Sequence, residues 1–426
     1  MKWIYILIGT TLLLLAPINQ WPVRDVQAAE TDRTIPLTYF GLHIHRIVQT
    51  QPWYPHGDRI TPWPSIKFGS WRLWDAYVGW PSLEPERGKW NFQTLDKYVT
   101  LAERGGVDLV LPLGLTPAWA SARPTEHSSY RPGNAAEPRN IDDWRNYVRT
   151  VALRYKGRIK YYELWNEVNM PEFYSGSKEK LLELARVAYQ TLKEIDPDIV
   201  FLSPSGTGNP AWLDQYLAMG GAKYLDVLSY HFYVPKSSPE AMLPLIQKVQ
   251  DIMRKHGLER IPLWNTETGW WIANRLKTPQ VGAAPDWRKL DDKLAAAYVV
   301  RSLLISWPAG VSRFYWFSWD GLDMGLIQIG SLELKPAARA FDTAVRWLVG
   351  GKIKQCNRDE QVWNCSLVKA DGKAAWVVWT EDDADRNWNI PAVWNITRTE
   401  SVDGSLSTSN GKSIWIGASP ILLTNG

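Results

Sequence analysis

Cysteine is scarce in this 426-residue chain, which contains only Cys356 and Cys365. Two cysteines exclude a small scaffold held together by several disulfides, and no group of histidines accompanies them, so no metal site is expected there. The two residues are nine positions apart, in a segment of short alternating runs. In an exported protein such a pair is expected to form one disulfide that closes a hairpin-like loop.

Blocks of like charge and low-complexity tracts are also missing. The 48 Lys and Arg residues nearly balance the 44 Asp and Glu residues, which leaves a net charge of +4. Without a basic patch, neither nucleic acid nor an anionic membrane surface is an expected partner. No internal repeat is visible, and the length suits a large domain joined to a smaller one.

Long apolar runs are absent except at residues 3–16, which follow Lys2. This run is shorter than the ~20 residues of a comfortable membrane span, and "VQA" at 26–28 fits a cleavage site. Residues 1–28 are therefore predicted to be an export signal, with an uncleaved N-terminal anchor as the alternative. The protein is then secreted, periplasmic or anchored to the outer face of the cytoplasmic membrane.

Tryptophan, in contrast, is abundant: there are 26 Trp beside 18 Tyr and only 9 Phe. The flat indole ring suits the apolar faces of sugars, but a large β/α core also uses Trp to fill space. Both interpretations stay open at this point.

Short strand-like runs alternate with longer amphipathic stretches from about residue 37 to 320. The expected strands are 37–45, 68–74, 107–114, 159–166, 198–206, 225–233, 261–269 and 312–320. Helical spacing of apolar residues marks segments such as 141–155, 178–195, 238–256 and 286–305. Eight strands separated by helices are typical of a (β/α)8 TIM barrel. A doubly wound open sheet is the competitor, but no Gly-rich phosphate turn follows the first strand.

A change of pattern follows a last helix near 335–349. Residues 350–426 are short alternating runs split by Asp, Gly, Asn and Ser, as in a small antiparallel β domain. We therefore expect a catalytic barrel at 29–345 and a sandwich-like β domain at 346–426, which can borrow strands from residues 29–40. A monomer is expected.

Two expected strands run directly into a carboxylate. "ELWNE" ends the fourth strand at Glu167, and "LWNTE" ends the seventh at Glu267. In a barrel, the C-terminal ends of the strands carry the reacting groups. By alternation, residues 163, 165 and 167 point the same way, so Glu163 is expected to lie deeper, as a structural partner.

The text "YYELWNEVN", followed 100 residues later by "LWNTETGW", resembles the glycoside hydrolases of clan A. Within the clan it is most similar to family 39 and to related enzymes that act on bacterial exopolysaccharides. "FGLHIH", "LGLTPAWAS", "LSYHFY" and "FYWFSWDG" resemble the family's strands too, so the resemblance spans roughly residues 37–345. Val168 departs from it, because many relatives have Pro there.

The resemblance implies a retaining mechanism that needs no cofactor and no metal. Glu167 would be the general acid/base and Glu267 the nucleophile, and two carboxylates ~5–5.5 Å apart permit direct attack on the anomeric carbon. Three supporting side chains are also implied: Asn166 on the sugar 2-OH, and Arg72 and Tyr233 on the nucleophile. His231 shares the strand face of Tyr233 by alternation, so it is expected to reach the cleft as well.

Aromatic and histidine residues complete the expected site. Trp319 is the predicted sugar platform and Trp316 its rival, since a bulge in the eighth strand would exchange them. His43 and His45 alternate toward the interior, where either a sugar contact or a satisfied core histidine is expected. A substrate groove is expected to use some of the Trp residues near strand ends: Trp74, Trp80, Trp119, Trp165, Trp270, Trp271 and Trp319.

The resulting hypothesis is an exported, endo-acting, retaining hydrolase of a β-linked polysaccharide or oligosaccharide. The alternatives are a transglycosylase with the same residues and a catalytically silent polysaccharide-binding barrel, with a phosphate-binding barrel enzyme as a distant third. The long loops 124–140 and 270–289 would shape the cleft. Basic residues in the second loop either meet uronic acids or are simply solvated: Arg275, Lys277, Arg288 and Lys289.

Overall fold

The computed structural model describes residues 33–48, 60–275 and 286–426 of the chain. The predicted export segment, residues 1–28, lies outside these ranges. Among the described residues, no helix combines the length and apolarity that spanning a membrane requires.

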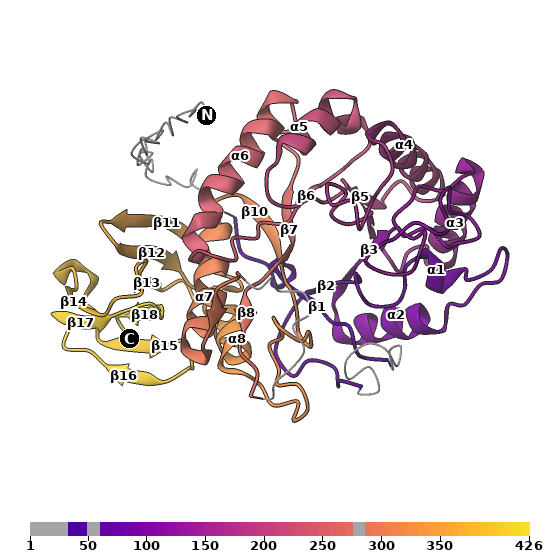
Figure 1. Cartoon of the computed structure of the whole chain (residues 1–426). Coiled ribbons are helices and arrows are strands. Elements are labelled where there is room, and N and C mark those ends of the chain that lie inside the picture. The colour runs from indigo at the N-terminus through magenta and orange to yellow at the C-terminus, as the bar shows by residue number, and fades with distance from the viewer. Residues whose placement is uncertain (1–32, 49–59, 276–285) are drawn as a thin grey trace, which may run out of the picture.

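Eight parallel strands form one sheet in the order β5-β4-β3-β2-β1-β10-β7-β6, with helices packed around it (Figure 1). These strands are β1 (Phe40–His43), β2 (Ser70–Arg72), β3 (Asp108–Leu113), β4 (Tyr161–Leu164), β5 (Val200–Leu202), β6 (Leu228–Tyr230), β7 (Leu263–Thr268) and β10 (Val311–Trp316). Parallel bridges from Leu202 to Val227 and from Thr207 to His231 join the β5 and β6 segments. They close the sheet, so the predicted (β/α)8 barrel is confirmed.

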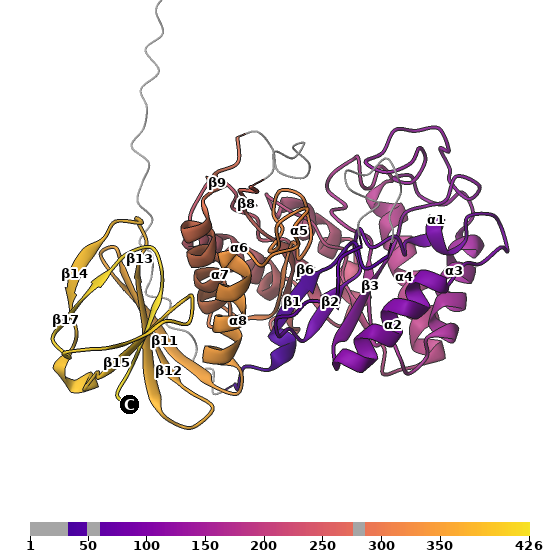
Figure 2. The same ribbon diagram turned by 90° about the horizontal axis from the view of Figure 1, so that it is seen from below.

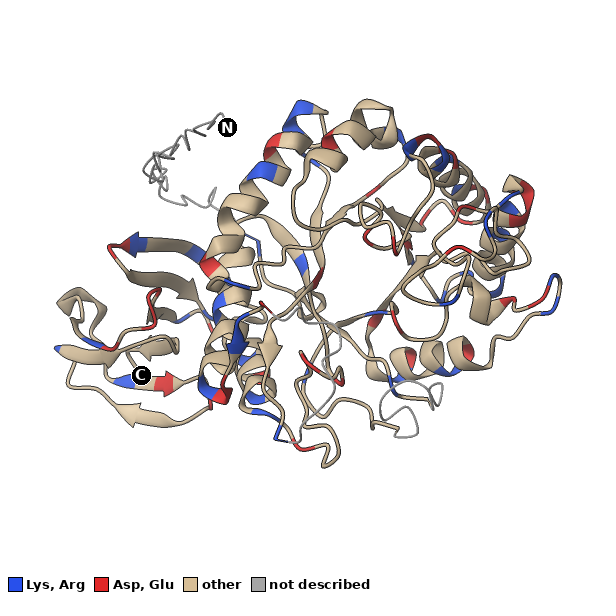
Figure 3. Cartoon of the chain, viewed as in Figure 1, with Lys and Arg blue, Asp and Glu red and all other residues tan. Residues whose placement is uncertain are grey.

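The helices lie antiparallel to the strands on the outer surface (Figure 2). They are α1 (Trp80–Leu83), α2 (Gln93–Gly105), α3 (Ile141–Arg154), α4 (Lys178–Ile195), α5 (Ala211–Ala218), α6 (Met242–Lys255), α7 (Asp292–Ser306) and α8 (Pro336–Leu348). Short 3-10 turns occur in the barrel at η1 (Leu37–Tyr39), η2 (Gly221–Lys223) and η3 (Pro239–Ala241), and in the C-terminal part at η4 (Ala392–Trp394). Red and blue residues alternate along these helices rather than gathering by sign (Figure 3).

The predicted helix at 286–305 begins later than expected. Lys289–Leu290 form strand β9, which pairs with β8 (Trp271–Ile272). The Asp291 side chain then accepts a hydrogen bond from the backbone N–H of Leu294 and caps α7. A capping carboxylate satisfies one of the free N–H groups of the first turn, so the helix starts after it.

The barrel interior is closed at its floor by side chains. Arg313 lies between the rings of Tyr161 and Trp264, 4.3 Å from each centroid, and pairs with Asp108 at 2.6 Å. These residues sit near the N-terminal ends of their strands. The barrel is therefore filled below and open only at the opposite end, where the strand C-termini lie.

The C-terminal part forms two antiparallel sheets. A six-stranded sheet has the order β11-β12-β13-β18-β15-β16, and β14 pairs with β17. The strands are β11 (Lys352–Asp359), β12 (Val362–Val368), β13 (Ala374–Thr380), β14 (Arg386–Asn389), β15 (Arg398–Ser401), β16 (Leu406–Thr408), β17 (Ser413–Ile416) and β18 (Ile421–Thr424). A separate apolar cluster between the sheets includes Val378, Ile390 and Ile416. This is the predicted small β domain.

A disulfide joins Cys356 of β11 to Cys365 of β12, as predicted from the sequence. The segment before the barrel also reaches this domain, because Ile35 exchanges backbone hydrogen bonds with Gly350 and Gly351 at 2.9 Å each. Residues 33–39 form no strand, however. The expectation that the small β domain includes a strand from residues 29–40 is therefore wrong for the described residues that precede β1.

Candidate active site

Glu167 and Glu267 both lie at the open end of the barrel. Irregular backbone beside each residue sets the direction of its side chain. Glu167 follows β4 by three residues, and both Trp165 and Glu167 have positive φ, at 56° and 41°. Such backbone is uncommon for residues other than glycine and clusters at functional sites. In β7, the pairings Asn265–Phe314 and Thr268–Trp316 leave one extra residue, a β-bulge beside Glu267.

The two carboxylates are close together. One oxygen of each, together with a ring nitrogen of His231, falls in a group whose atoms all lie within 4.8 Å of one another. Inverting glycosidases hold their carboxyl groups about 6.5–9.5 Å apart to admit a water, whereas retaining enzymes hold them about 5–5.5 Å apart. The spacing here fits the retaining geometry.

Glu267 is held by two donors. Arg72 Nη1 donates to Glu267 Oε2 at 3.0 Å, and the Tyr233 hydroxyl donates to Oε1 at 2.9 Å. Arg72 is fully buried and also donates through Nε to Glu163 Oε2 at 2.5 Å. Thr266 donates to the other Glu163 oxygen at 3.1 Å. Glu163 therefore lies deeper as a partner of Arg72, as the strand alternation predicted.

Glu167 has a different neighbour. His231 Nδ1 lies 2.9 Å from Glu167 Oε1 and 4.0 Å from Glu267 Oε1. Burial lowers the pKa of His231 to about 4, so this imidazole is neutral near pH 7. Asn166 Oδ1 accepts from Arg72 Nη2 at 2.8 Å. Among the described residues, no acceptor pairs with the Asn166 amide nitrogen, which is left to donate to a ligand.

Burial raises the pKa of both catalytic candidates. It raises the pKa of Glu167 to about 7, partly offset by Arg72, and likewise raises the pKa of Glu267 to about 7. Two carboxylates this close titrate as a pair, so near neutral pH they share one proton. The direct hydrogen bonds from Arg72 and Tyr233 stabilise negative charge on Glu267. These contacts therefore favour the shared proton on Glu167 rather than on Glu267.

The two tryptophans expected as the sugar platform are both buried. Trp316 is fully buried, is stacked 5.8 Å from Trp270, and donates through Nε1 to the Met324 carbonyl at 3.2 Å. Trp319 is only 2% exposed. Neither indole has an open face, so the platform prediction is wrong for Trp316 and lacks support for Trp319. The missed candidate is Phe317 between them, which is partly exposed.

His43 and His45 pack against Phe317, with ring centroids 5.1 and 5.0 Å away. His43 Nε2 lies 2.9 Å from the Thr266 carbonyl oxygen, and His45 Nδ1 lies 3.9 Å from Asp320. Both histidines are buried. Both rings therefore lie in the core, but among the described residues His43 Nδ1 and His45 Nε2 have no hydrogen-bond partner. The two interpretations that the sequence left open are not separated by these contacts.

The predicted groove tryptophans divide into two groups. Trp80, Trp165 and Trp270 are fully buried, so the groove role fails for them. Trp165 lies against Trp144 of α3, because the chain turns with positive φ and breaks the expected alternation. Trp74 is 5% exposed beside Arg72.

Trp119 and Trp271 remain available. Each is partly exposed, and each follows the C-terminal end of a barrel strand. Arg87 lies 4.7 Å from the ring of Trp119, and Lys289 lies 5.2 Å from the ring of Trp271. A cation on one face leaves the other face of the ring for a ligand.

The basic residues of the second loop are mostly paired within the protein. Arg275 pairs with Glu333 at 2.7 Å, and Arg288 pairs with Asp383 at 2.9 Å. Lys277 lies outside the described residues. A uronic-acid contact by this group has no support from these pairs.

Three polar or aromatic residues near the glutamates were missed. Asp75, three residues after β2, accepts a 2.5 Å hydrogen bond from the Tyr130 hydroxyl. Burial is the largest cause of the raised pKa of both glutamates, and the charge of Asp75 adds a smaller increase. Trp287 lies 5.6 Å from Tyr233. Asp75 carried a usable signal, since it comes directly after the strand expected at 68–74. Tyr130 and Trp287 belong to long loops, whose course the sequence does not specify.

The cluster of Glu167, His231 and Glu267 has a spacing that a metal ion could also bridge. Arg72 lies 3.0 Å from Glu267, and its fixed positive charge opposes a cation at that position. The arrangement is better suited to proton transfer and nucleophilic attack between the two carboxylates.

Comparison with known proteins agrees with this geometry. The family model "Glycosyl hydrolases family 39" matches residues 82–306, more than half of the chain. A family 39 glycoside hydrolase from Bacteroides cellulosilyticus WH2 superposes with a TM-score of 0.68 at 20% identity, over 92% of this chain and 81% of that one.

Two further structures share the fold. A family 39 β-xylosidase from Caulobacter crescentus gives a TM-score of 0.60 at 17% identity, over 84% of this chain and 89% of that one. A family 30 subfamily 8 xylanase from Clostridium acetobutylicum gives 0.55 at 13%, over 84% and 89%. With the family match and the paired glutamates, the chain belongs to glycosyl hydrolases family 39 and is a glycoside hydrolase of a retaining family.

Proposed function

We propose that this enzyme cleaves a β-linked polysaccharide by double displacement through a covalent glycosyl-enzyme. Glu267 is the nucleophile and Glu167 is the general acid/base. The observation that carries the proposal is the asymmetry of the pair. Arg72 and Tyr233 donate to Glu267, whereas the side-chain partner of Glu167 among the described residues is the neutral His231. The neighbouring xylosidase and xylanase structures support a β-linked substrate class.

The first step uses the proton held by Glu167. Glu267 attacks the anomeric carbon while Glu167 protonates the leaving oxygen, so the glycosidic bond breaks as the ester forms. The charge of Glu267 disappears in that ester. Without it the pKa of Glu167 falls, and the carboxylate of Glu167 now takes a proton from water. The water oxygen then attacks the anomeric carbon and breaks its bond to Glu267. This second inversion releases the Glu267 carboxylate and gives a product of retained configuration.

Two substitutions test the assignment. Glu267→Gln keeps the shape of the side chain but removes its charge, so turnover is expected to fall by at least about 10³-fold with unchanged thermal unfolding. The surface variant Glu194→Gln, on α4, is the matched control and should keep wild-type turnover. A Glu267→Gln enzyme with more than about a tenth of wild-type activity would refute the role.

Glu167→Ala tests the acid/base. A substrate with a good leaving group should still form the glycosyl-enzyme, which then persists because no base activates water. Added azide should restore turnover and give a β-glycosyl azide of retained configuration. No rescue, together with an inverted product, would point to a different mechanism.

We also propose that the protein is exported. The segment 1–28 has the pattern of an export signal, and the Cys356–Cys365 disulfide is typical of an oxidising compartment. N-terminal sequencing of the protein recovered outside the cytoplasm tests this. A chain found only in the cytoplasm would contradict it.

A further inference from the structure

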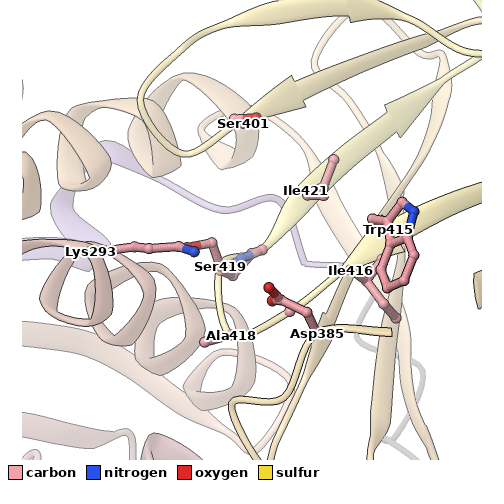
Figure 4. Close-up of a pocket in the computed structure, with 10 residues that line it drawn as sticks. Lys293, Asp385, Ser401, Trp415, Ile416, Ala418, Ser419 and Ile421 are labelled. Atoms are coloured by element: carbon pink, nitrogen blue, oxygen red, sulfur yellow. The ribbon is translucent and has the colours of Figure 1, made fainter. Parts of the chain in front are cut away.

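A pocket of about 220 Å³ lies where the small β domain meets the barrel, away from the two glutamates (Figure 4). Residues of β15, β17 and β18 line it, together with Asp385 before β14 and Lys293 of α7. Figure 4 shows Lys293 reaching from α7 toward Ser419, with Asp385 and Trp415 on the side of the β strands. Both parts of the molecule therefore build this pocket.

The lining combines one exposed aromatic ring with unused polar groups. Trp415 is 69% exposed, although a side chain of this size is normally covered. Within the described parts of the chain, the side chains of Asp385, Lys293 and Ser419 have no hydrogen-bond or ion-pair partner. A flat ring beside donors and acceptors matches the two surfaces of a pyranose, an apolar C–H face and a rim of hydroxyls.

The charges of the lining select the class of ligand. One carboxylate and one ammonium cancel, so the pocket favours neither a polyanion nor a polycation. Hydroxyl groups, which both donate and accept, are suited to satisfy Asp385 and Lys293 at once. A neutral carbohydrate meets this requirement.

The pocket is held in shape from two sides. Asp385 lies directly against Gly417, because a Cβ on that glycine would come within 2.0 Å of Asp385 Oδ1. Two residues earlier, Asp383 is fixed to the barrel by Arg301 at 2.8 Å and by Arg288 at 2.9 Å. A loop that is already ordered loses little conformational freedom when a ligand binds.

The position of the pocket links it to the active site. Lys293 lies in the first turn of α7, and the helices of a barrel begin at the end where the strand C-termini lie. The pocket therefore faces the same end of the barrel as Glu167 and Glu267. We propose that it is a second carbohydrate-binding site, which holds another segment of the same polymer outside the catalytic cleft. This inference rests on the proposed polysaccharide substrate.

Binding without cleavage tests the second site. In a Glu267→Gln background, retardation in gels that contain soluble xylan, glucomannan or mixed-linkage β-glucan gives an apparent Kd. Adding Trp415→Ala or Asp385→Ala should weaken binding to the retarding polymer about three- to tenfold, the size expected for one lost stacking ring or one polar contact. Leu406→Ala, which removes another exposed apolar side chain (74% exposed), is the matched control and should leave the Kd unchanged.

The outcomes separate the two proposals. Equal retardation of the Trp415→Ala variant and its parent, or no retardation of the parent by any of the three polymers, overturns the second site. A loss that Leu406→Ala reproduces overturns it as well. Hydrolysis by the wild-type enzyme, measured separately on the same polymers, decides the proposed function. Retardation that depends on Trp415 without hydrolysis would leave the second site standing and remove the polysaccharide hydrolase.

Discussion

At the scale of single residues, the proposed chemistry depends on two glutamates that are similarly buried but have different hydrogen-bond partners. Arg72 and Tyr233 both donate to Glu267, and within the part of the chain that the structure describes no cationic side chain pairs with Glu167. Arg72 thereby links the nucleophile, Asn166 and Glu163 in one buried network. Such a network fixes the geometry of the site before any substrate arrives. Preorganised charges and donors of this kind are a main source of electrostatic catalysis.

The pH dependence of activity follows from the burial of this pair. Because burial raises the pKa of Glu167 to about 7, kcat/KM should fall as the pH rises through about 7, when the acid loses its proton. A pH–rate profile on an uncharged glycoside measures this. Activity that stays level to pH 9 would contradict the assignment of Glu167 as the acid.

Asp75 should tune that profile. Its negative charge raises the pKa of both glutamates, so Asp75→Asn is expected to move the whole pH–rate profile to lower pH while keeping an oxygen for Tyr130. Tyr130→Phe removes the same hydrogen bond without changing a charge, and its profile should stay in place. Equal shifts in both variants would show that the effect comes from the loop rather than from the charge.

At the scale of elements, strand irregularities do the positioning. The bulge in β7 and the positive-φ turn after β4 turn two ordinary barrel strands into supports for carboxylates. The β11–β12 hairpin shows a different device: Cys356 and Cys365 lie directly opposite each other in its register and are joined. The first two features serve the reaction, and the third serves the small β domain.

Removing the disulfide should weaken that domain and spare the chemistry. A nine-residue separation corresponds to about 2–3 kcal/mol in the chain-entropy description, an upper value here because the hairpin is already paired. The double variant Cys356→Ser, Cys365→Ser should therefore unfold several degrees earlier in calorimetry, with unchanged turnover of a small glycoside. An unfolding temperature identical to wild type would show that the hairpin is stable without the covalent link.

At the scale of the whole molecule, a buried polar network joins the barrel to the small β domain. Arg301 of α7 pairs with Glu240 at 2.5 Å and with Asp383 at 2.8 Å, and Trp379 of β13 donates to Glu240 at 2.8 Å. The Arg301 side chain is completely buried. Each member therefore depends on the others for its hydrogen bonds.

Breaking this network should cost far more than breaking a surface pair between the same two parts. Glu240→Ala removes one of the two carboxylates that pair with the buried Arg301 and leaves the Trp379 indole N–H without its acceptor, so it should lower the free energy of unfolding by about 3 kcal/mol in urea. Glu400→Ala removes the partially exposed pair with Arg346, at 2.8 Å, and should change it by less than about 1 kcal/mol. Similar losses in the two variants would mean that burial does not set the value of this pair.

The partly exposed aromatic rings predict the mode of cleavage. Partly exposed rings follow several strand ends, namely Trp119, Trp271, Trp287 and Phe317. Rings spread over several loops suit an open groove that binds consecutive sugars, and we therefore expect endo action. The viscosity of a long soluble β-glycan should fall early in digestion. Steady release of monosaccharide with little change in viscosity would instead indicate a pocket that trims chain ends.

The sequence by itself determined the architecture and the identity of the two carboxylates. Eight strand-like runs separated by amphipathic stretches specify a barrel, because each strand must bury both faces and each helix only one. Glu167 and Glu267 were visible because a charge directly after a buried strand is costly unless it has a partner or a reaction. The cysteine pair was visible for a similar reason, as two close thiols in a short alternating segment.

Only the tertiary structure decided which aromatic rings are open and what each carboxylate touches. Strand alternation predicts side-chain direction until the backbone leaves the strand, and it failed at Trp165, where positive φ turns the chain toward α3. For the same reason the sequence favoured Trp316 and Trp319 over Phe317, which lies between them and is the partly exposed ring. Tyr130 contacts Asp75, and Trp287 contacts Tyr233, in each case from a different loop. Contacts between residues so far apart in the chain are fixed by packing, which no local pattern encodes.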